Sequence, residues 1–305
     1  MKVLLVRAGA LGDIVLLRRA VAGLKLAGVA VGLLAPIATA HAILGPGLSS
    51  VDECLDWDDP AFLPLFAEEA SGLEGLRPLL NAFDAAIAYT SRTDLVRGLE
   101  RLIPTVIASS PFPSGAHAAE SLSRPTLALG GRPPLLPPDL EATDAERAEA
   151  EAFVADRVAD RLPPGFLALH PGSGSPAKNW PPARFAALAR VLGPTPWLLV
   201  EGPADVDAAR ALASSESVVP ARGLSARALG VLLAHAGLFV GHDSGVTHLA
   251  AAWGVPTLAL FGPTDPALWS PVGRRVAVLR SSTGSMLDLS VADVAAAALG
   301  LLGGA

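Results

Sequence analysis

Residues 238–271 have the sequence LFVGHDSGVTHLAAAWGVPTLALFGPTDPALWSP. A short apolar run opens this stretch, breaks at Gly241, and gives way from Val246 onward to apolar residues at helical spacing. The pattern predicts a buried parallel strand that leads into a helix, followed by a second buried strand at Pro256–Phe261 and a second polar turn. In open α/β folds such turns lie at the carboxyl edge of the sheet, where ligands bind. We therefore predict a doubly wound parallel sheet with a ligand site at this edge.

The first polar turn places backbone amides at the start of the predicted helix. The N–H groups of Ser244, Gly245 and Val246 have no partner inside such a helix, and its dipole puts partial positive charge beside them. A helix terminus of this kind binds anions, most simply phosphate. The neighbouring Asp243 has two interpretations, a local helix cap or an acceptor for sugar hydroxyls.

The composition excludes several classes of protein. Hydrophobic residues make up 51% of the 305 residues, but Gly, Pro or a charge interrupts every apolar run before the roughly 18 residues that a membrane span requires. The opening MKVLLVRAGALGD also lacks the apolar core of a secretory signal. A single cysteine, Cys54, rules out an internal disulfide, and a net charge of −6 gives no general attraction to nucleic acid. We expect a cytoplasmic protein without a transmembrane segment that binds no nucleic acid.

The N-terminal segment predicts a strand at Val3–Val6 and a helix at Ile14–Leu26. Strand, glycine-containing turn and helix follow in the order of a dinucleotide site, but a GxGxxG frame that ends on Gly12 would need glycine at Arg7. The next predicted strand also ends without the acidic residue that holds a ribose, so a nicotinamide site is disfavoured. Asp13 is either a helix cap or a general base at the mouth of the sheet.

A second phosphate-type loop follows the strand predicted at Phe166–Leu169. Residues 170–180 read HPGSGSPAKNW, in which glycines and small hydroxyls let backbone amides approach an oxyanion. Lys178 adds a compact positive charge. The alternative is an ordinary flexible loop with a surface lysine.

A third candidate feature follows the strand predicted at Trp197–Val200. A carboxylate at this edge of the sheet can accept two hydrogen bonds from a ribose diol. Glu201, Asp205 and Asp207 are all candidates, and Glu201 is favoured among them. A charged turn residue is the competing interpretation.

Strands alternate with helices along the whole chain, which predicts two domains with parallel sheets. Gly130–Pro138 is a proline-rich connector, and a charged helix that Thr143 can cap follows it. We place the domain boundary near residue 162, after that helix. The predicted domains are therefore residues 1–162 and 163–305, the second ending in a helix at about 290–302.

Three segments carry a resemblance to a known family. HDSGVTHLAAAWGVPTLALFGPTDP, residues 242–266, resembles the signature of the family 9 glycosyltransferases, the ADP-heptose:lipopolysaccharide heptosyltransferases. VLLVRAGALGDIVLLRRA (residues 3–20) and HPGSGSPAKNWPPARFAALA (residues 170–189) match in the expected order. Together the three segments touch both halves of the chain.

The resemblance implies a fold and a reaction. The fold would be GT-B, with two Rossmann-like domains facing across a cleft, residues 1–162 on the acceptor side and residues 163–305 holding the nucleotide-sugar. The terminal helix would pack back on the first domain. The reaction would be inverting, metal-independent transfer of heptose from an ADP-heptose to a lipopolysaccharide core or related glycan. No cofactor beyond the nucleotide-sugar substrate is expected, and a lipid-linked acceptor implies peripheral contact with the cytoplasmic face of the inner membrane.

The resemblance also implies roles for individual residues. Asp13 would act as the general base, and Lys178 would stabilise the departing diphosphate. The expected donor-binding residues are Ser173, Gly174, Lys178, Glu201, Asp243, Ser244, Gly245, Val246, Thr247 and His248. The acceptor-side candidates are Gly12, Arg18, Arg92 and His117, for which a solvated surface position is the alternative.

Other functions stay open at this stage. A phosphorylated lipid core favours a basic cleft, whereas acidic and basic residues are nearly balanced in the first half of the chain. The donor could therefore be another nucleotide-sugar, or the acceptor a protein. A non-catalytic nucleotide-sugar-binding protein is disfavoured because both Asp13 and Lys178 are present.

Overall fold

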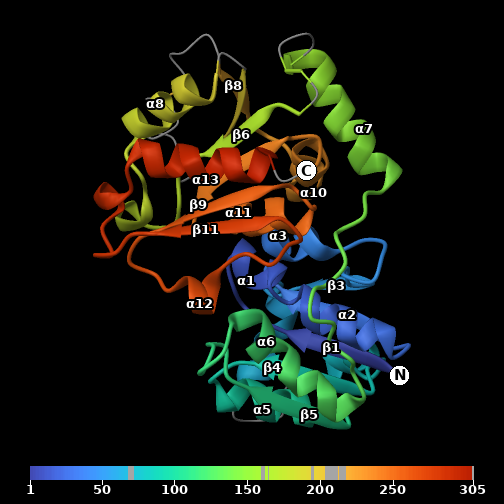
Figure 1. Cartoon of the computed structure of the whole chain (residues 1–305). Helices are drawn as coiled ribbons and strands as arrows, with labels where there is room; N and C mark the ends of the chain where they lie inside the picture. The colour runs from blue at the N-terminus through green and yellow to red at the C-terminus, as the bar shows by residue number, and fades with distance from the viewer. Residues whose placement is uncertain are drawn as a thin grey trace. The chain divides into compact units, whose positions relative to one another are not determined.

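The computed structural model describes residues 1–67, 72–158, 162–163, 165–193, 196–202, 212 and 218–303. The chain forms two compact units, Met1–Glu141 and Ala142–Ala305. Each unit has one parallel sheet flanked by helices (Figure 1), so the prediction of two doubly wound α/β domains is confirmed.

Within its described residues, the first unit is built on a five-stranded sheet of order β3-β2-β1-β4-β5. Its strands are β1 Lys2–Val6, β2 Ala30–Ala35, β3 Glu53–Asp56, β4 Ala85–Tyr89 and β5 Thr105–Ser109. Its α-helices are α1 Leu11–Val15, α2 Arg18–Leu26, α3 Ile37–Ala40, α4 Arg77–Leu80, α5 Thr93–Glu100 and α6 Ala118–Ser123. Its 3-10 segments are η1 His41–Ile43, η2 Pro60–Phe66, η3 Leu73–Leu76 and η4 Arg124–Leu129.

The first strand agrees with the prediction, whereas the helix after it does not. Strand β1 lies at the centre of the sheet and pairs in parallel with both β2 and β4, as its continuous apolar run indicates. The single helix predicted at Ile14–Leu26 is instead divided into α1 and α2. The amide of Leu17 donates to the carbonyl of Ile14, an i→i−3 bond that tightens the chain between the two helices.

Within its described residues, the second unit is built on a six-stranded sheet of order β11-β10-β9-β6-β7-β8. Its strands are β6 Leu167–His170, β7 Trp197–Val200, β8 Val218–Ala221, β9 Leu238–His242, β10 Thr257–Phe261 and β11 Val276–Arg280. Its α-helices are α7 Asp144–Phe153, α8 Pro182–Leu192, α10 Ala226–Leu233, α11 Gly245–Ala252, α12 Pro266–Trp269 and α13 Val291–Gly303. A π-helical segment, Val154–Val158, continues α7, and 3-10 turns occur at η7 Pro176–Lys178 and η8 Met286–Asp288.

Residues 238–271 fold as predicted. They form β9, α11 and β10, and every residue of the two strands is buried. Central strands of a parallel sheet are covered on both faces, which explains why both strands are mainly apolar.

The core of the second unit lies between its sheet and the helices α8 and α13. Trp180, Phe185 and Trp197 are at most 1% exposed, and the rings of Trp180 and Phe185 meet edge to face with centroids 5.0 Å apart. Helix α13, drawn in red in Figure 1, buries Val294 and Ala298 in the same cluster. The terminal helix was expected to pack on the first domain; in the structure its apolar face is part of the core of the second unit.

Helix α7 lies between the predicted and the observed division of the chain. The boundary expected near residue 162 follows this helix, whereas the compact units divide between Glu141 and Ala142, before it. The helix belongs to the second unit because Arg227 of α10 donates to Glu146 at 2.5 Å. Thr143 caps it as predicted, accepting from the Glu146 amide while the Glu146 carboxylate accepts from the Thr143 amide.

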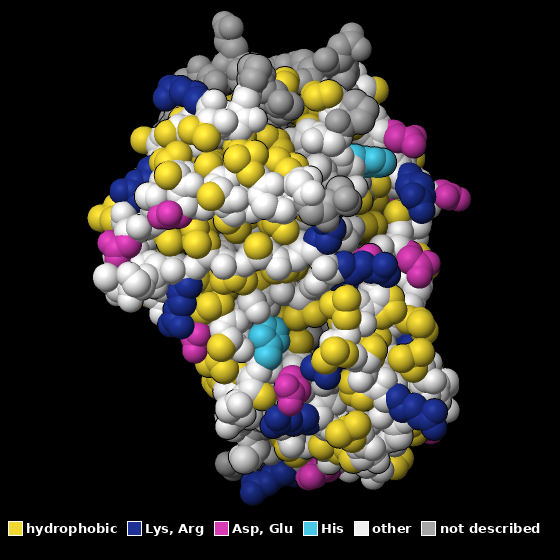
Figure 2. All heavy atoms as spheres, viewed as in Figure 1, with side chains coloured by type: hydrophobic (Ala, Val, Ile, Leu, Met, Phe, Trp, Pro, Cys, Tyr) yellow, Lys and Arg dark blue, Asp and Glu magenta, His cyan; other side chains and the backbone are white. Residues whose placement is uncertain are grey.

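The surface reflects the unusual composition. Figure 2 shows hydrophobic side chains over much of the visible surface of the second unit. On the face shown, the basic side chains of the described residues are interspersed with acidic ones. This distribution lacks the basic stripe that a nucleic-acid-binding face requires.

A buried glycine in the first unit provides a test of its packing. A Cβ added to Gly98 of α5 would lie 2.3 Å from the carbonyl oxygen of Leu65, so alanine must push two backbone segments apart. We expect Gly98→Ala to lower the free energy of unfolding by about 1–3 kcal/mol in urea denaturation. Gly300→Ala in α13 is the control, because its added Cβ meets open space and alanine favours a helix by up to about 1 kcal/mol. Equal midpoints for the two variants would contradict the packing of α5 on η2.

Candidate functional site

The middle strands of the second sheet end side by side at one edge. Strands β6, β9 and β10 are neighbours and parallel, so their carboxyl ends, at His170, His242 and Phe261, share that edge. The loop after β6 carries Lys178, and the turn after β9 leads into α11. The two phosphate-type motifs of the sequence, 65 residues apart at Lys178 and Asp243, therefore lie together.

Lys178 and Asp243 form the centre of this cluster. The Lys178 ammonium donates to Asp243 Oδ2 at 2.8 Å, and the two side chains are 28% and 11% exposed. The other carboxylate oxygen of Asp243 is 4.0 Å from Nε2 of His248, which is itself almost fully buried. The interpretation of Asp243 as a helix cap is wrong, since Ser244 occupies the N-cap position of α11. Asp243 instead neutralises and orients the lysine.

The start of α11 presents its amides at the same edge. The carbonyl of Ser244 accepts from the amides of Thr247 and His248, which are the first bonds of the helix. The amides of Ser244, Gly245 and Val246 precede those bonds, so they are the donors that a helix start leaves for a ligand. Residues 243–246 are all partly exposed.

A line of hydrogen bonds fixes the hydroxyl of Ser244. Thr247 Oγ1 donates its one proton to the carbonyl of His242 at 2.6 Å, so it accepts from Ser244 Oγ at 3.2 Å. The Ser244 proton is then used, and Nδ1 of His170, 3.2 Å away, must donate to Ser244 Oγ. The hydroxyl of Thr247, a predicted donor contact, thus braces strand β9 against α11. No pattern in the sequence predicts this use of His170.

The loop that carries Lys178 is braced in a similar way. Ser173 Oγ is 2.8 Å from the carbonyl of Ser175 and 2.6 Å from Oδ1 of Asn179, so the hydroxyl ties the two ends of the loop together. Ser173 is buried, whereas Gly174 is exposed and has open space around it. Of these two predicted donor contacts, Gly174 is the one whose backbone faces solvent.

Glu201, at the end of β7, is held by a residue that sequence analysis missed. Arg222 donates to both carboxylate oxygens, from Nε at 2.6 Å and from Nη2 at 2.9 Å. The carboxylate is 8% exposed and the arginine 56%, and hydrogen bonding to Glu201 raises the pKa of Arg222. Asp205 and Asp207, the other two ribose candidates, lie outside the described residues.

In the first unit, Asp13 is the third residue of α1 and has a buried partner. Arg7, 3% exposed, donates from Nη2 to Asp13 Oδ1 at 2.7 Å and from Nη1 to the carbonyl of Pro111 at 3.0 Å. Asp13 Oδ2 accepts from the amide of Ala10 at 3.1 Å, so the carboxylate does secure the helix start. The side chain keeps 29% of its surface exposed, which leaves it accessible to a ligand. A Cβ on Gly9 would lie 2.7 Å from that of Asp13, so glycine makes room for the aspartate.

The four acceptor-side candidates have different surroundings. Gly12 precedes Asp13 in α1 and is partly exposed. Arg18 is 2% exposed and donates to the carbonyl of Pro138, and burial lowers its pKa to about 10 although nearby Asp139 acts the other way. This burial favours a structural role for Arg18, which holds the connector against α2.

Arg92 and His117 are the remaining two candidates. Arg92 is exposed, donates to Asp94 and lies over the ring of Phe66, 4.8 Å from its centroid. It also lines a surface hollow of about 280 Å³. Nδ1 of His117 accepts from the amide of Ala119 and so caps α6. Contact of any of these residues with an acceptor stays a prediction.

Metal binding and thiol chemistry are not indicated by the described residues. No group of three or more His, Cys, Asp or Glu side chains is arranged there to hold a metal ion. The thiol of Cys54 has its pKa raised to about 12, first by burial and then by the charge of Glu53, so it is a poor nucleophile at neutral pH. Among the same residues, no helix has the length and hydrophobicity needed to cross a membrane.

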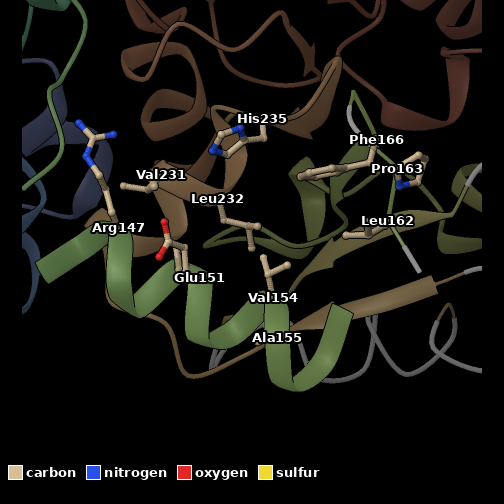
Figure 3. A pocket seen from close by; sticks show the side chains of 11 residues that line it. Arg147, Glu151, Val154, Ala155, Leu162, Pro163, Phe166, Val231, Leu232 and His235 are labelled. Atoms are coloured by element: carbon tan, nitrogen blue, oxygen red, sulfur yellow. The ribbon is translucent and has the colours of Figure 1, made fainter. Parts of the chain in front are cut away.

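A larger hollow lies elsewhere on the second unit, between α7 and α10. It has a volume of about 630 Å³, and its lining is mainly apolar, including Val154, Phe166 and Leu232 (Figure 3). Figure 3 shows Arg147, Glu151 and His235 as polar side chains beside it. None of the predicted site residues lines this hollow, so it is distinct from the Lys178–Asp243 cluster.

Comparison with known families gives a match over most of the second unit. Residues 121–297 match the family model described as glycosyltransferase family 9 (heptosyltransferase). This range is more than half of the chain. It contains the Lys178 loop, Glu201 and the start of α11.

Individual relatives agree with that match. The chain is 36% identical over 125 residues to lipopolysaccharide heptosyltransferase 1 of Pseudomonas aeruginosa, which covers 39% of this chain and 35% of that protein. It is 28% identical over 161 residues to lipopolysaccharide heptosyltransferase 2 of Escherichia coli K12, which covers 50% and 45%. Across the curated relatives, the matches span less than half of each relative's length.

Solved structures extend the likeness to the whole fold. A glycosyl transferase family 9 protein from Veillonella parvula superposes with a TM-score of 0.81 at 19% identity, covering 100% of this chain and 98% of that one. The ADP-heptose lps heptosyltransferase II of E. coli gives 0.77 at 20% identity, with 99% and 98% covered. At such identities the likeness concerns the fold alone, and it confirms the predicted GT-B class of two Rossmann-like domains.

The free energy of unfolding should depend on the Arg7–Asp13 ion pair. Asp13→Ala should lower the free energy of unfolding by about 1.5–3 kcal/mol, because a buried guanidinium loses its charged acceptor. Asp13→Asn keeps an acceptor oxygen and should lose less. Urea denaturation of both variants and of the unchanged protein measures the difference. If Asp13→Ala is as stable as the unchanged protein, the pair does not support the fold.

Proposed function

This chain belongs to glycosyltransferase family 9, and on that premise we propose that it transfers heptose from an ADP-heptose to a lipopolysaccharide core or related glycan. The observation that carries the proposal is the cluster of Lys178, Asp243 and the start of α11 at one sheet edge. The cluster lies inside the range that matches the family model. It combines a partly exposed positive charge with backbone donors, which is the chemistry that a diphosphate leaving group needs.

The donor would bind along the edge of the second sheet. The paired phosphates would meet the amides of Ser244, Gly245 and Val246 together with the Lys178 ammonium. Asp243 accepts from that ammonium at 2.8 Å, and a bound diphosphate would share the lysine's charge with it. The carboxylate of Asp243 is then available to the sugar hydroxyls.

The remaining donor contacts follow from position in the sheet. Glu201 directly follows β7, which is two places from β9 in the strand order, and its carboxylate would accept from the ribose hydroxyls. Arg222 already occupies one position on each of its oxygens, and each oxygen has a second lone pair for the diol. His248, close to Asp243, would contact phosphate or sugar.

The transfer itself would be a single displacement with inversion. The acceptor hydroxyl attacks the anomeric carbon, the bond from that carbon to the diphosphate oxygen breaks, and the hydroxyl proton passes to Asp13. Arg7 holds the Asp13 carboxylate in place through their ion pair. Charge develops on the departing diphosphate, where Lys178 and the start of α11 stabilise it in the way a divalent cation otherwise would, so we propose a metal-independent reaction.

The basic residues of the first unit bear on the identity of the acceptor. Of the arginines considered for it, Arg18 is buried and Arg92 is paired with Asp94. A phosphorylated lipid core would favour free basic groups. A glycosyltransferase of the same fold with a less anionic glycan acceptor, or a protein acceptor, is therefore the second candidate. A lipid-linked acceptor would bring the protein into peripheral contact with the cytoplasmic face of the inner membrane.

Nucleotide preference tests the donor. A ligand that binds the folded state raises its stability, by about 2.7 kcal/mol at 100 times its dissociation constant. If the donor is an ADP-sugar, ADP should bind more tightly than UDP or GDP and should raise the melting temperature more at equal concentration. Lys178→Met should reduce the shift with ADP while leaving the shift with adenosine unchanged. A stronger response to UDP would reject the ADP-sugar donor and support another nucleotide-sugar.

Substitution of the base tests the mechanism. Asp13→Asn keeps the acceptor oxygen for Arg7 and removes the basicity, so transfer should fall by at least about 10²-fold. Binding of ADP, measured by titration calorimetry, should be essentially unchanged because Asp13 belongs to the other unit. Undiminished turnover in this variant would exclude Asp13 as the base.

A further inference from the structure

His242 lies beside the two ends of the 172–180 loop, which carries Lys178. It is the last residue of β9 and its side chain is fully buried. Its Nε2 lies 2.7 Å from the backbone nitrogen of Trp180, and its Nδ1 lies 3.3 Å from the carbonyl oxygen of Gly172. The imidazole thus contacts both ends of the loop that contains Lys178.

The two contacts define the protonation state of the ring. A backbone N–H can only donate, so Nε2 of His242 must present a lone pair to Trp180. The single proton of the neutral ring is then on Nδ1, where it is donated to the carbonyl of Gly172. One tautomer of the neutral ring therefore satisfies both contacts at once.

The surroundings hold the ring rigidly. Phe185 meets His242 edge to face at 5.4 Å, and Trp180 packs on Phe185. The indole N–H of Trp180 donates to the carbonyl of Leu289 at 2.9 Å, which fixes the far end of the loop to the rest of the unit. The near end follows β6 directly.

The position of the ring bears directly on the lysine. Asp243, the acceptor for Lys178, is the next residue after His242 in the chain. The same short segment therefore sets both the ends of the lysine's loop and the carboxylate that the lysine meets. A shift of the loop relative to β9 would change the distance from the ammonium to the start of α11 as well.

We propose that His242 is a positioning residue for diphosphate binding, which clamps the two ends of the 172–180 loop and so places Lys178 beside the start of α11. The proposal rests on the proposed function of this edge as the donor site. The ring does not touch the ligand; it acts through the lysine. Hydrogen bonds that support the ligands of a metal are typically worth about 10- to 100-fold in affinity, and we expect about tenfold here.

The experiment measures ADP affinity by titration calorimetry for five variants and the unchanged protein. His242→Phe keeps the ring and its edge contact with Phe185 but removes both hydrogen bonds. His242→Gln restores an acceptor oxygen near the position of Nε2. Lys178→Met and the double variant of Lys178→Met with His242→Phe complete a cycle. Leu188→Ala is the matched control, because it removes packing from the same core while the His242 side chain and its two hydrogen-bond partners are kept.

The expected pattern distinguishes the clamp from general loosening. His242→Phe should weaken ADP binding about tenfold, and His242→Gln should recover part of that loss. In the Lys178→Met background, His242→Phe should cause no further loss, because its effect passes through the lysine. Leu188→Ala should lower the melting temperature while ADP affinity stays unchanged.

Three results would overturn the inference. ADP affinity of His242→Phe equal to that of the unchanged protein removes the clamp. An equal loss in both lysine backgrounds shows that the ring acts by some other route. A loss in His242→Gln as large as that in His242→Phe shows that the acceptor at Nε2 is not the part that matters. Absence of ADP binding by the unchanged protein would reject the proposed function itself, and it is seen before any variant is made.

Discussion

The ion pair between Lys178 and Asp243 is the contact on which the proposed donor site depends. It exists because β6 and β9 are adjacent parallel strands, so the loops that follow them start from the same edge. The aspartate holds a scarce positive charge near the start of α11, and partial exposure leaves the ammonium accessible. Removing either partner would leave a half-buried charge without compensation, so the pair serves both the resting structure and ligand binding.

Around that pair, most of the neighbouring polar side chains are occupied with one another rather than directed at solvent. Ser173 closes its own loop, Thr247 ties α11 to β9, and His170 orients Ser244. Side chains that look like ligand contacts in the sequence thus form the support for a smaller set of groups that face the ligand. Such support keeps backbone amides in place before a ligand arrives, which lowers the cost of ordering them on binding.

Most strands and some helices of the second unit were predicted from the sequence, but several side-chain contacts were not. Strands β9 and β10 and helix α11 were predictable because apolar runs and glycine breaks are local signals. The proximity of Lys178 and Asp243 was predictable because parallel topology brings strand ends together. The roles of Arg7, Arg222 and His242 were not predicted, because each depends on individual hydrogen bonds that a local sequence pattern does not indicate. The boundary at residue 141 was displaced for the same reason, because the contact between Arg227 and Glu146 joins residues 81 positions apart.

The partnership of Arg7 with Asp13 constrains how this protein can vary over evolutionary time. Because the guanidinium is enclosed and makes its second bond to a main-chain carbonyl, it cannot swing out to solvent when the carboxylate is lost. Loss of the aspartate alone therefore leaves a protein that is both inactive, under the proposed mechanism, and less stable. A lineage that abandons catalysis would therefore change both positions together, or keep at position 13 an acceptor such as asparagine that still pairs with Arg7.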